Sequence, residues 1–512
     1  MIYYKSTRGD RGLYTFSEAV LKGIAEDGGL FVPEIIPQFT LGELKLLSKK
    51  SYQEQAIFIF NLFQTNITEN AIRRFVNKAY STNFNNPLIA PVVHLKENQY
   101  FLELWHGPSA TFKDLALQIM PLLFSESLNI NNKTRIAMGE KPVKYLLLVA
   151  TSGDTGKAAL EGYKDKENIF IIILYPDNHV SKLQELQMVT QEGNNLAVYA
   201  LNGDFDAVQT TVKEVFNDKK FNQELFNKYQ ILLSSANSIN WGRLVPQIVY
   251  YVSSYIDLIG KNILTWGDQI NITVPTGNFG NILAAFYAKK MGLPIKKLIC
   301  ASNTNNVLTE FLKTGVYDIK NRKLTQTPSP SMDILVASNI ERLLFTITGS
   351  AEKVSLWMHE LKKKRKFEVD NATKTVLQNE FYADWVSSQD CLTNIKTIYN
   401  KTNYLMDPHT SVAQEVAERY LKQDSFSSPM IICSTAHWAK FAKDVYRALK
   451  NHKEKLVMDE FKIIETITKF APGNPVPKNL YELKNKIIKH KQKCEADQNV
   501  LEKKIKEFLN ML

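Results

Sequence analysis

Lys113 is the residue whose type and setting most clearly suggest chemistry. It lies just after Gly107-Pro108, a pair that interrupts regular backbone, and at the start of a helical pattern. Phe112 and Leu115 flank it, so we expect its amine to enter a partly dry pocket. Desolvation lowers the pKa of a lysine and makes an uncharged amine available for a Schiff base. The alternative is an exposed helix lysine beside Asp114, since most lysines lie on the surface.

A glycine-rich loop, TGNFGN from Thr276 to Asn281, separates a predicted strand from a predicted helix. Gly277 and Gly280 let the backbone approach a ligand closely, and the start of the helix supplies free N–H groups and the positive end of a dipole. The loop therefore suits a phosphate group. Loops of this composition also serve packing alone, so the loop by itself leaves both interpretations open.

A second polar loop, TSGDTG from Thr151 to Gly156, is followed by Lys157 and so contains a Gly-Lys pair. A nucleotide-binding P-loop requires an earlier glycine, separated from that pair by four residues, and a Ser or Thr after it. Thr151 and Ala158 occupy these two positions, which excludes a P-loop. Backbone N–H groups at the start of the following helix still favour a bound anion.

The composition indicates a globular protein of two or three domains, because 512 residues exceed the usual size of one domain. The net charge of +11, from 63 basic and 52 acidic residues, favours anionic partners. The basic residues are spread out and no RNP, helix-turn-helix or zinc-finger pattern accompanies them, so we do not expect nucleic acid as a partner.

The cysteines lie far apart without a CxxC pair, which predicts reduced thiols and neither a disulfide framework nor a metal site. The first residues, MIYYKSTRGDRG, lack the apolar core of a secretory signal. The longest apolar runs, such as Ile169 to Leu174, are too short to span a bilayer. We therefore expect a cytoplasmic protein with no membrane partner.

The order of elements explains how these loops could meet. From Tyr145 the sequence repeats an apolar strand, a polar loop and an amphipathic helix, as in YLLLVA-TSGDTG-KAALEGY and MIICSTAH-WAKFAKDVYRAL. Such alternation predicts parallel sheets covered on both faces. Ligands in these sheets bind where strands end and helices begin, so each polar loop is a candidate wall of one site.

The lysine segment HGPSATFKD, from His106 to Asp114, resembles the signature of the threonine synthase family, HGPT-x-x-FKD, in which the lysine binds pyridoxal 5′-phosphate (PLP). Ser109 stands where the family usually has Thr. The stretch from Ser6 to Glu34 is similar to the family's amino-terminal signature. Further matching motifs follow in the family's order: TSGDTG at 151–156, NSINWGR at 237–243, VPTGNFGN at 274–281, SPSMDI at 329–334, DPHTSVA at 407–413 and STAHWAKF at 434–441.

The resemblance implies a fold and a division into domains. The expected fold class is α/β, the tryptophan synthase β-like PLP fold, with two parallel-sheet domains and the cofactor between them. The predicted parts are a mostly helical N-terminal accessory domain at 1–95, a large PLP-binding α/β domain at 96–114 and 200–490 with a helical insertion near 341–401, a small α/β domain at 115–199, and a C-terminal helical tail at 491–512.

The resemblance also implies which residues hold the cofactor. Lys113 would form the Schiff base with PLP, and Thr435 would place a hydroxyl opposite the pyridine nitrogen. A hydroxyl, unlike a carboxylate, gives no charge to hold a proton on that nitrogen, so a neutral ring is expected. The phosphate of PLP would bind in the glycine-rich loop, at Gly277, Asn278, Phe279, Gly280 and Asn281.

The implied substrate is O-phospho-L-homoserine, which needs two further anion sites. The α-carboxylate would contact the second polar loop, and Asn240 would lie nearby. Arg243 is the first choice for the substrate phosphate because its planar fork suits phosphate; Arg8 and Lys182 are weaker choices. The predicted carboxylate contacts are Thr151, Ser152, Asp154 and Thr155.

The activity implied by the resemblance is that of a threonine synthase, a PLP-dependent lyase that forms L-threonine and phosphate from O-phospho-L-homoserine and water. One alternative is a PLP-dependent phospholyase that releases a keto acid, ammonia and phosphate. Another is an inactive binding protein on the same fold, which the intact Lys113 and TGNFGN loop argue against. A monomer or a homodimer is expected.

Overall fold

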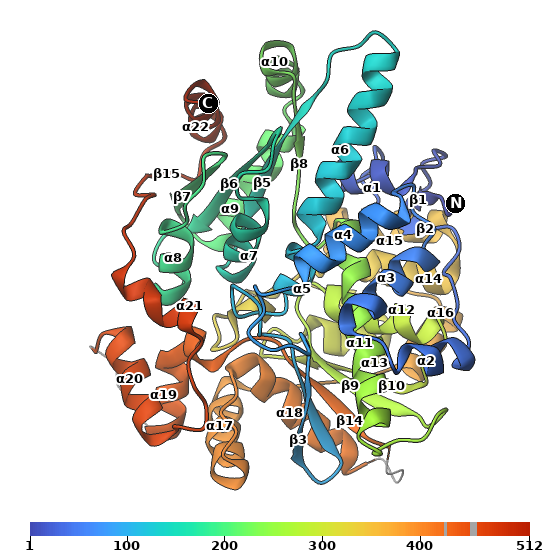
Figure 1. Cartoon of the computed structure of the whole chain (residues 1–512), viewed down its shortest axis with the longest axis vertical. Helices are drawn as coiled ribbons and strands as arrows, with labels where there is room; N and C mark the ends of the chain where they lie inside the picture. The colour runs from blue at the N-terminus through green and yellow to red at the C-terminus, as the bar shows by residue number, and fades with distance from the viewer. Residues whose placement is uncertain (424–427, 451–457) are drawn as a thin grey trace.

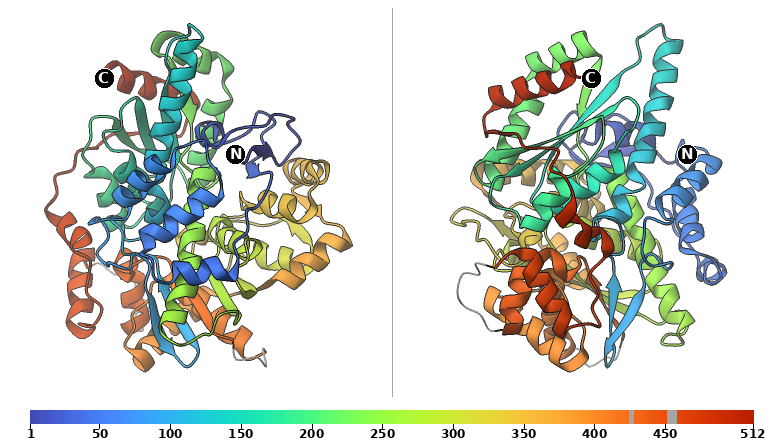
Figure 2. Two further views of the ribbon diagram at one scale, coloured as in Figure 1. Left: turned by 45° about the vertical axis from the view of Figure 1, so that its right-hand side comes forward. Right: turned by 60° about the vertical axis from the view of Figure 1, so that its left-hand side comes forward.

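The computed structural model of the chain describes residues 1–423, 428–450 and 458–512. Within these residues two main sheets lie at opposite ends of the molecule, and the helices near the N-terminus pack along one side (Figure 1, Figure 2). The predicted α/β class with two parallel sheets is confirmed.

The large sheet contains six strands within the described residues, in the order β13-β10-β9-β14-β4-β3. Its neighbours pair in parallel except β3, which forms an antiparallel hairpin with β4 at one edge. The central strands β9 and β14 are buried at every residue, as expected for strands covered on both faces. The strands are β3 (Val92–Lys96), β4 (Gln99–Glu103), β9 (Ile270–Pro275), β10 (Ile295–Ser302), β13 (Phe381–Trp385) and β14 (Met430–Ser434).

The small sheet contains five strands within the same residues, all parallel, in the order β15-β7-β6-β5-β8. In β5, Leu146 and Leu148 pack into one apolar cluster, whereas Leu147 and Val149 pack into the main core on the other face. Both faces are therefore covered, which explains the unbroken apolar run. The strands are β5 (Lys144–Ala150), β6 (Ile169–Pro176), β7 (Leu196–Asn202), β8 (Ile231–Ser234) and β15 (Lys493–Glu495).

The strand pairing corrects two predicted boundaries. The small domain was expected to end at residue 199, but β7 continues to Asn202 and β8 pairs with β5, so the small sheet draws on the chain as far as Ser234. The segment 491–512 was expected to be a helical tail; it begins instead with β15, which extends the small sheet beside β7. A three-residue strand is too short to show a period in the sequence.

The last helix, α22 (Gln498–Asn510), packs against α9 (Phe205–Asn217) over one face of the small sheet (Figure 2). Leu501, Ile505 and Phe508 join the apolar cluster on that face. The C-terminal segment thus pairs with and packs on the small sheet.

The N-terminal segment is mostly helical, as predicted, and its only strands among the described residues before β3 form a short antiparallel pair. The insertion near 341–401 is also mostly helical, but it contains β12 and supplies β13 to the edge of the large sheet. The short strands are β1 (Tyr4–Ser6), β2 (Phe31–Pro33), β11 (Val316–Asp318) and β12 (Lys366–Glu368).

The remaining helices cover the sheets and connect the strands, and none in the described part of the chain is long and apolar enough to cross a bilayer. They are α1 (Phe16–Lys22), α2 (Leu41–Leu47), α3 (Tyr52–Leu62), α4 (Glu69–Ala79), α5 (Asp114–Leu117), α6 (Met120–Ala137), α7 (Asp154–Tyr163), α8 (Lys182–Val189), α10 (Lys219–Tyr229), α11 (Trp241–Gly260), α12 (Gly280–Lys290), α13 (Val307–Thr314), α14 (Ile340–Thr348), α15 (Ala351–Lys364), α16 (Asn371–Glu380), α17 (Ser388–Thr402), α18 (Pro408–Leu421), α19 (Ala442–Lys450), α20 (Glu460–Phe470) and α21 (Lys478–Tyr481), with the short 3₁₀ helices η1 (Pro330–Met332), η2 (Trp438–Phe441) and η3 (Glu482–Asn485).

The packing of α22 leads to a stability prediction. Leu501→Ala removes a fully buried side chain, which should cost about 2–5 kcal/mol and speed amide hydrogen exchange in β15 and α9. Lys503→Ala, on the exposed side of the same helix, is the matched control and should exchange like the parent protein. Equal exchange in the two variants would show that α22 is not part of the cooperative small domain.

Candidate active site

Lys113 is held at the carboxyl ends of two neighbouring strands of the large sheet. The chain leaving β4 runs beside the chain leaving β14: the N–H of Leu104 donates to the carbonyl of Ser434 over 2.9 Å, and the N–H of Phe112 donates to the carbonyl of Thr435 over 2.8 Å. Lys113 then forms the N-terminal boundary of α5. This is the edge at which parallel sheets bind ligands.

Asp154, the first residue of α7, follows β5 of the small sheet and contacts Lys113. Gly162 allows α7 to lie against α5, because a Cβ atom there would come within 2.0 Å of the carbonyl oxygen of Leu117. The Nζ atom of Lys113 is 3.2 Å from Oδ2 of Asp154 and 3.5 Å from the hydroxyl of Ser331. The lysine thus meets a carboxylate from the other sheet.

The surroundings of Lys113 shift the ionisation of its amine toward the neutral form. The residue is only 9% exposed, and this burial lowers the pKa of its amine below the ordinary value. Asp154 opposes the shift by attracting the charged form, whereas Lys440 and Arg243 add to it by repulsion. The interpretation of Lys113 as an exposed helix lysine does not fit this burial.

Asp154 accepts hydrogen bonds from four side chains in the described part of the chain. Lys113 and Ser331 reach Oδ2, and Lys440 and Gln184 each reach Oδ1 over 2.8 Å. Burial works against the charged carboxylate, but the two lysines outweigh it and lower the pKa of Asp154. The carboxylate therefore stays ionised inside the protein.

The glycine-rich loop lies between β9 and α12, as predicted from its sequence. Phe279 ends it in a left-handed conformation, with φ of 63°. Gly277 packs against the segment of η1: a Cβ atom there would lie 2.5 Å from the carbonyl oxygen of Ser331. The side-chain oxygen of Asn281 accepts from the hydroxyls of Tyr250 and Tyr251, and its buried amide nitrogen has no hydrogen-bond partner among the described residues.

These residues fit the phosphate and aldehyde of PLP. The first turn of α12 presents backbone N–H groups, and the Asn281 amide nitrogen is a further donor without an acceptor. Gly277, Asn278 and Gly280 belong to the same turn, and Gly280 opens the helix. Lys113 offers a desolvated amine. Thr435 lies beside the segment that carries Lys113, because its carbonyl accepts a hydrogen bond from the N–H of Phe112.

Some of the hydrogen-bonding groups of the TSGDTG loop bond to the backbone of the loop itself. The hydroxyl of Thr151 accepts from the N–H groups of Gly153 and Gly156, each over 3.0 Å. Ser152 and Thr155 are partly exposed at the start of α7. The hydroxyl of Thr151 is thus engaged by its own loop and the carboxylate of Asp154 by the four donors described above, whereas the predicted contacts Ser152 and Thr155 stay accessible.

Arg243, in the first turn of α11, is a buried cation that pairs with no carboxylate among the described residues. It is 4% exposed; its Nη1 donates to the carbonyl of Ala236 over 2.9 Å, and its Nε has no partner there. Burial lowers the pKa of the guanidinium to about 10, which still leaves it charged at neutral pH. A buried charge without a counter-ion is costly, so this position suits an anionic ligand.

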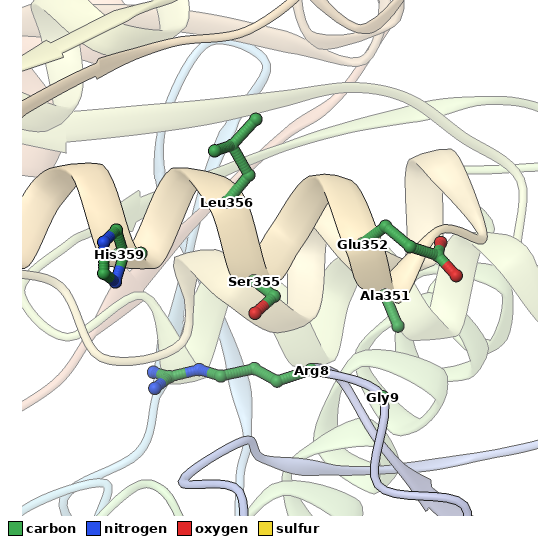
Figure 3. Close-up of a pocket in the computed structure, with 7 residues that line it drawn as sticks. All are labelled: Arg8, Gly9, Ala351, Glu352, Ser355, Leu356 and His359. Carbon is green, nitrogen blue, oxygen red and sulfur yellow. The ribbon is translucent and has the colours of Figure 1, made fainter.

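Three other predicted substrate residues have partners elsewhere. Arg8 pairs with Glu341 over 2.5 Å and lines a surface hollow of about 450 Å³ beside α15 (Figure 3). Lys182 is 47% exposed and pairs with Glu185 over 2.8 Å. Asn240 caps α11, accepting from Gly242 and donating to the carbonyl of Val20. The structure does not bring Arg8 or Lys182 into contact with Lys113.

The sequence analysis missed three residues that contact the centre of the site. Lys440 and Gln184 bind Asp154, and Ser331 contacts both Lys113 and Asp154. Lys440 lies within the STAHWAKF motif and Ser331 within SPSMDI, so their membership of these motifs was the available signal. Gln184 had no such signal.

Two family models match the chain: "Threonine synthase N terminus" over residues 3–80 and "Threonine synthase, C-terminal" over residues 410–497. The human protein threonine synthase-like 1 is 41% identical over 504 residues, which are 96% of this chain and 66% of the human protein. The chain spans 58–66% of the length of four such mammalian relatives.

The threonine synthase of Schizosaccharomyces pombe is 38% identical over 480 residues, 88% of this chain and 90% of that protein. The crystal structure of threonine synthase from yeast superposes with a TM-score of 0.87 at 35% identity, covering 100% of this chain and 99% of that one. The PLP-bound threonine synthase of Brucella melitensis gives a TM-score of 0.85 at 33% identity, covering 99% of both chains. With this identity over nearly the full length of both proteins, the chain belongs to the threonine synthase family.

Proposed function

We propose that this protein is a PLP-dependent lyase that converts O-phospho-L-homoserine and water to L-threonine and phosphate. The observation that carries the proposal is Arg243, a buried guanidinium without a carboxylate partner among the described residues, close enough to the desolvated Lys113 to lower its pKa. A desolvated lysine together with a buried arginine that pairs with no carboxylate among the described residues matches a substrate that carries its own phosphate.

The residues that would hold PLP are Lys113, which would bind it covalently through its amine, and the loop 276–281, which would bind its phosphate at the start of α12. Thr435 would offer the pyridine nitrogen a hydroxyl, which carries no charge and would leave the ring neutral. When bound, PLP supplies an electron sink for the bonds broken at the amino acid.

Lys113 is also the base of the reaction. Its amine would take protons from the α-carbon and then the β-carbon of the bound substrate, and would return protons to the γ-carbon and the α-carbon as threonine forms. Its low exposure keeps water from competing for these protons, and a positioned base of this kind typically contributes ~10²–10⁴-fold to the rate.

Arg243 binds the substrate phosphate and keeps it near the β-carbon after it leaves the γ-carbon, where it serves as an acid–base group for the addition of water. The substrate carboxylate binds at the start of α7, with Ser152 and Thr155 as its side-chain contacts. Phosphate and carboxylate thus fix the substrate at its two ends.

The proposed setting is the cytoplasm, with a monomer or homodimer and a small-molecule substrate. The proposed domains follow the two sheets, with the site between them and the N-terminal helices as an accessory part.

The covalent role of Lys113 is directly testable. Borohydride reduction of the protein with PLP should leave the label on the peptide that contains Lys113, and Lys113→Ala should lose the label and ~10²–10⁴-fold in activity. Lys213→Ala, at an exposed helix position, is the control and should keep both. A label on another lysine would overturn the proposed mechanism.

The role of Arg243 separates a synthase from a phospholyase. Charge-assisted hydrogen bonds contribute about 1.5–3 kcal/mol, so Arg243→Ala should raise KM for O-phospho-L-homoserine about 10- to 100-fold. It should also shift the products from threonine toward 2-oxobutyrate, because a poorly held phosphate cannot assist hydration. Arg243→Lys should recover only part of the loss, since it lacks the bidentate fork.

Arg8→Ala and Lys182→Ala are matched controls for Arg243→Ala, because both cations are paired elsewhere. Steady-state assays of threonine, keto acid and phosphate together would measure all variants. Parental KM and threonine yield in Arg243→Ala would assign the phosphate to other residues, and 2-oxobutyrate as the main product of the parent protein would identify a phospholyase.

A further inference from the structure

Lys440 is a second lysine at the site, more deeply buried than Lys113. It lies in η2, just after β14, and is 0% exposed. Its Nζ atom is 2.8 Å from Oδ1 of Asp154 and 2.8 Å from the carbonyl oxygen of Ser109. Both contacts are short and enclosed, so this ammonium group stays in place.

We infer that Lys440 is a positioning residue that acts as the permanent counter-ion of Asp154 and so allows Lys113 to give up its proton inside the site. The inference rests on the proposed role of Lys113 as the residue that binds PLP. Lys440 touches neither substrate nor cofactor in this scheme and acts through Asp154.

The charges of Asp154, Lys113 and Lys440 must nearly balance because all three groups are buried. Asp154 carries one negative charge, and two lysines contact it from opposite oxygens: Lys440 on Oδ1 at 2.8 Å and Lys113 on Oδ2 at 3.2 Å. If Lys113 loses its proton, Lys440 and Asp154 remain as a neutral pair. A buried carboxylate whose only cation was Lys113 would instead hold the proton on that amine.

Lys440, the lysine closer to Asp154, is also the more firmly held of the two. Lys440 is fixed by the Ser109 carbonyl as well as by Asp154, whereas the second hydrogen-bond partner of Lys113 among the described residues is Ser331 Oγ, at a longer 3.5 Å. The geometry therefore divides the two amines into a fixed charge and a movable reactive group.

The other groups around the two amines do not replace Lys440. Arg243 repels a charge on Lys113, and the ring of Phe112, 5.0 Å from Nζ of Lys113, weakly favours the charge. Asp114, which accepts from the N–H and the hydroxyl of Ser109, and His437 also interact electrostatically with Lys440. Gln184 donates to the same oxygen of Asp154 as Lys440, but it carries no charge.

Gln184 therefore provides a matched control. Removing it costs one hydrogen bond to Oδ1 of Asp154 and leaves the charge balance unchanged, whereas removing Lys440 costs a contact with the same oxygen, the contact with the Ser109 carbonyl and the charge. A purely structural role for Lys440 would make the two variants behave alike, whereas a charge-balancing role would separate them.

The test measures the ionisation of Lys113 in the full chain freed of PLP. Trace acetic anhydride labels only uncharged amines, so the pH dependence of labelling of the Lys113 peptide, read by mass spectrometry against exposed Lys213, gives the midpoint of its titration. Lys440→Met should raise this midpoint by about one pH unit or more, a tenfold smaller reactive fraction at neutral pH. Lys440→Arg, which keeps the charge, should leave the midpoint close to that of the parent protein.

The double variant Lys440→Met/Asp154→Asn removes both charges and should bring the midpoint back to or below that of the parent protein. Gln184→Leu should shift it far less than Lys440→Met. Should Lys440→Met fail to fold, Lys440→Gln keeps a hydrogen-bond donor without the charge and should show the same rise.

A midpoint that stays in place or falls in the uncharged variants would overturn the inference. So would a rise that persists in the double variant, because the proton on Lys113 would then not depend on Asp154. The proposed function fails by a different result, namely PLP bound elsewhere or a product other than threonine, and the labelling of the cofactor-free protein does not depend on either.

Discussion

Asp154 carries a buried negative charge on which the arrangement of the whole site depends. The carboxylate follows a strand of the small sheet, whereas Lys113 and Lys440 follow strands of the large sheet, so one group of charges joins the two halves of the molecule. Ions removed from water are stable only when their partners are close and well oriented. Gln184 and Ser331 complete the set of donors and fix the carboxylate in one orientation.

The parallel sheets and the loops of the site were predictable from the sequence because each depends on local pattern. Apolar strands followed by small polar residues and a helix predict where ligands bind, and the loops at Thr151 and Thr276 occupy the expected strand ends. Burial of Lys113 was predictable from its apolar neighbours. The partners of that lysine were not, because Asp154 and Ser331 are 41 and 218 positions away along the chain.

Asn240 and Thr151 show where a rule of local structure outweighs a motif. Each lies just before a helix, where short polar side chains accept hydrogen bonds from free backbone N–H groups. Thr151 accepts from Gly153 and Asn240 accepts from Gly242 in this way. Membership of a family motif did not distinguish this capping role from contact with a ligand. For Arg8 the partner could not be predicted from local structure, because its pairing with Glu341 joins residues 333 positions apart.

The parallel pairing of β15 with β7 has a consequence for how the protein is made. The small sheet is assembled from residues 144–234 and from a strand that begins at Lys493, so about half of the chain is synthesised between its parts. On the ribosome, the outer edge of β7 and the apolar face later covered by α22 stay open until residues 493–510 emerge. Open strand edges and apolar faces promote association between chains, so the nascent small sheet is most vulnerable to aggregation in this interval, which ends when β15 pairs with β7.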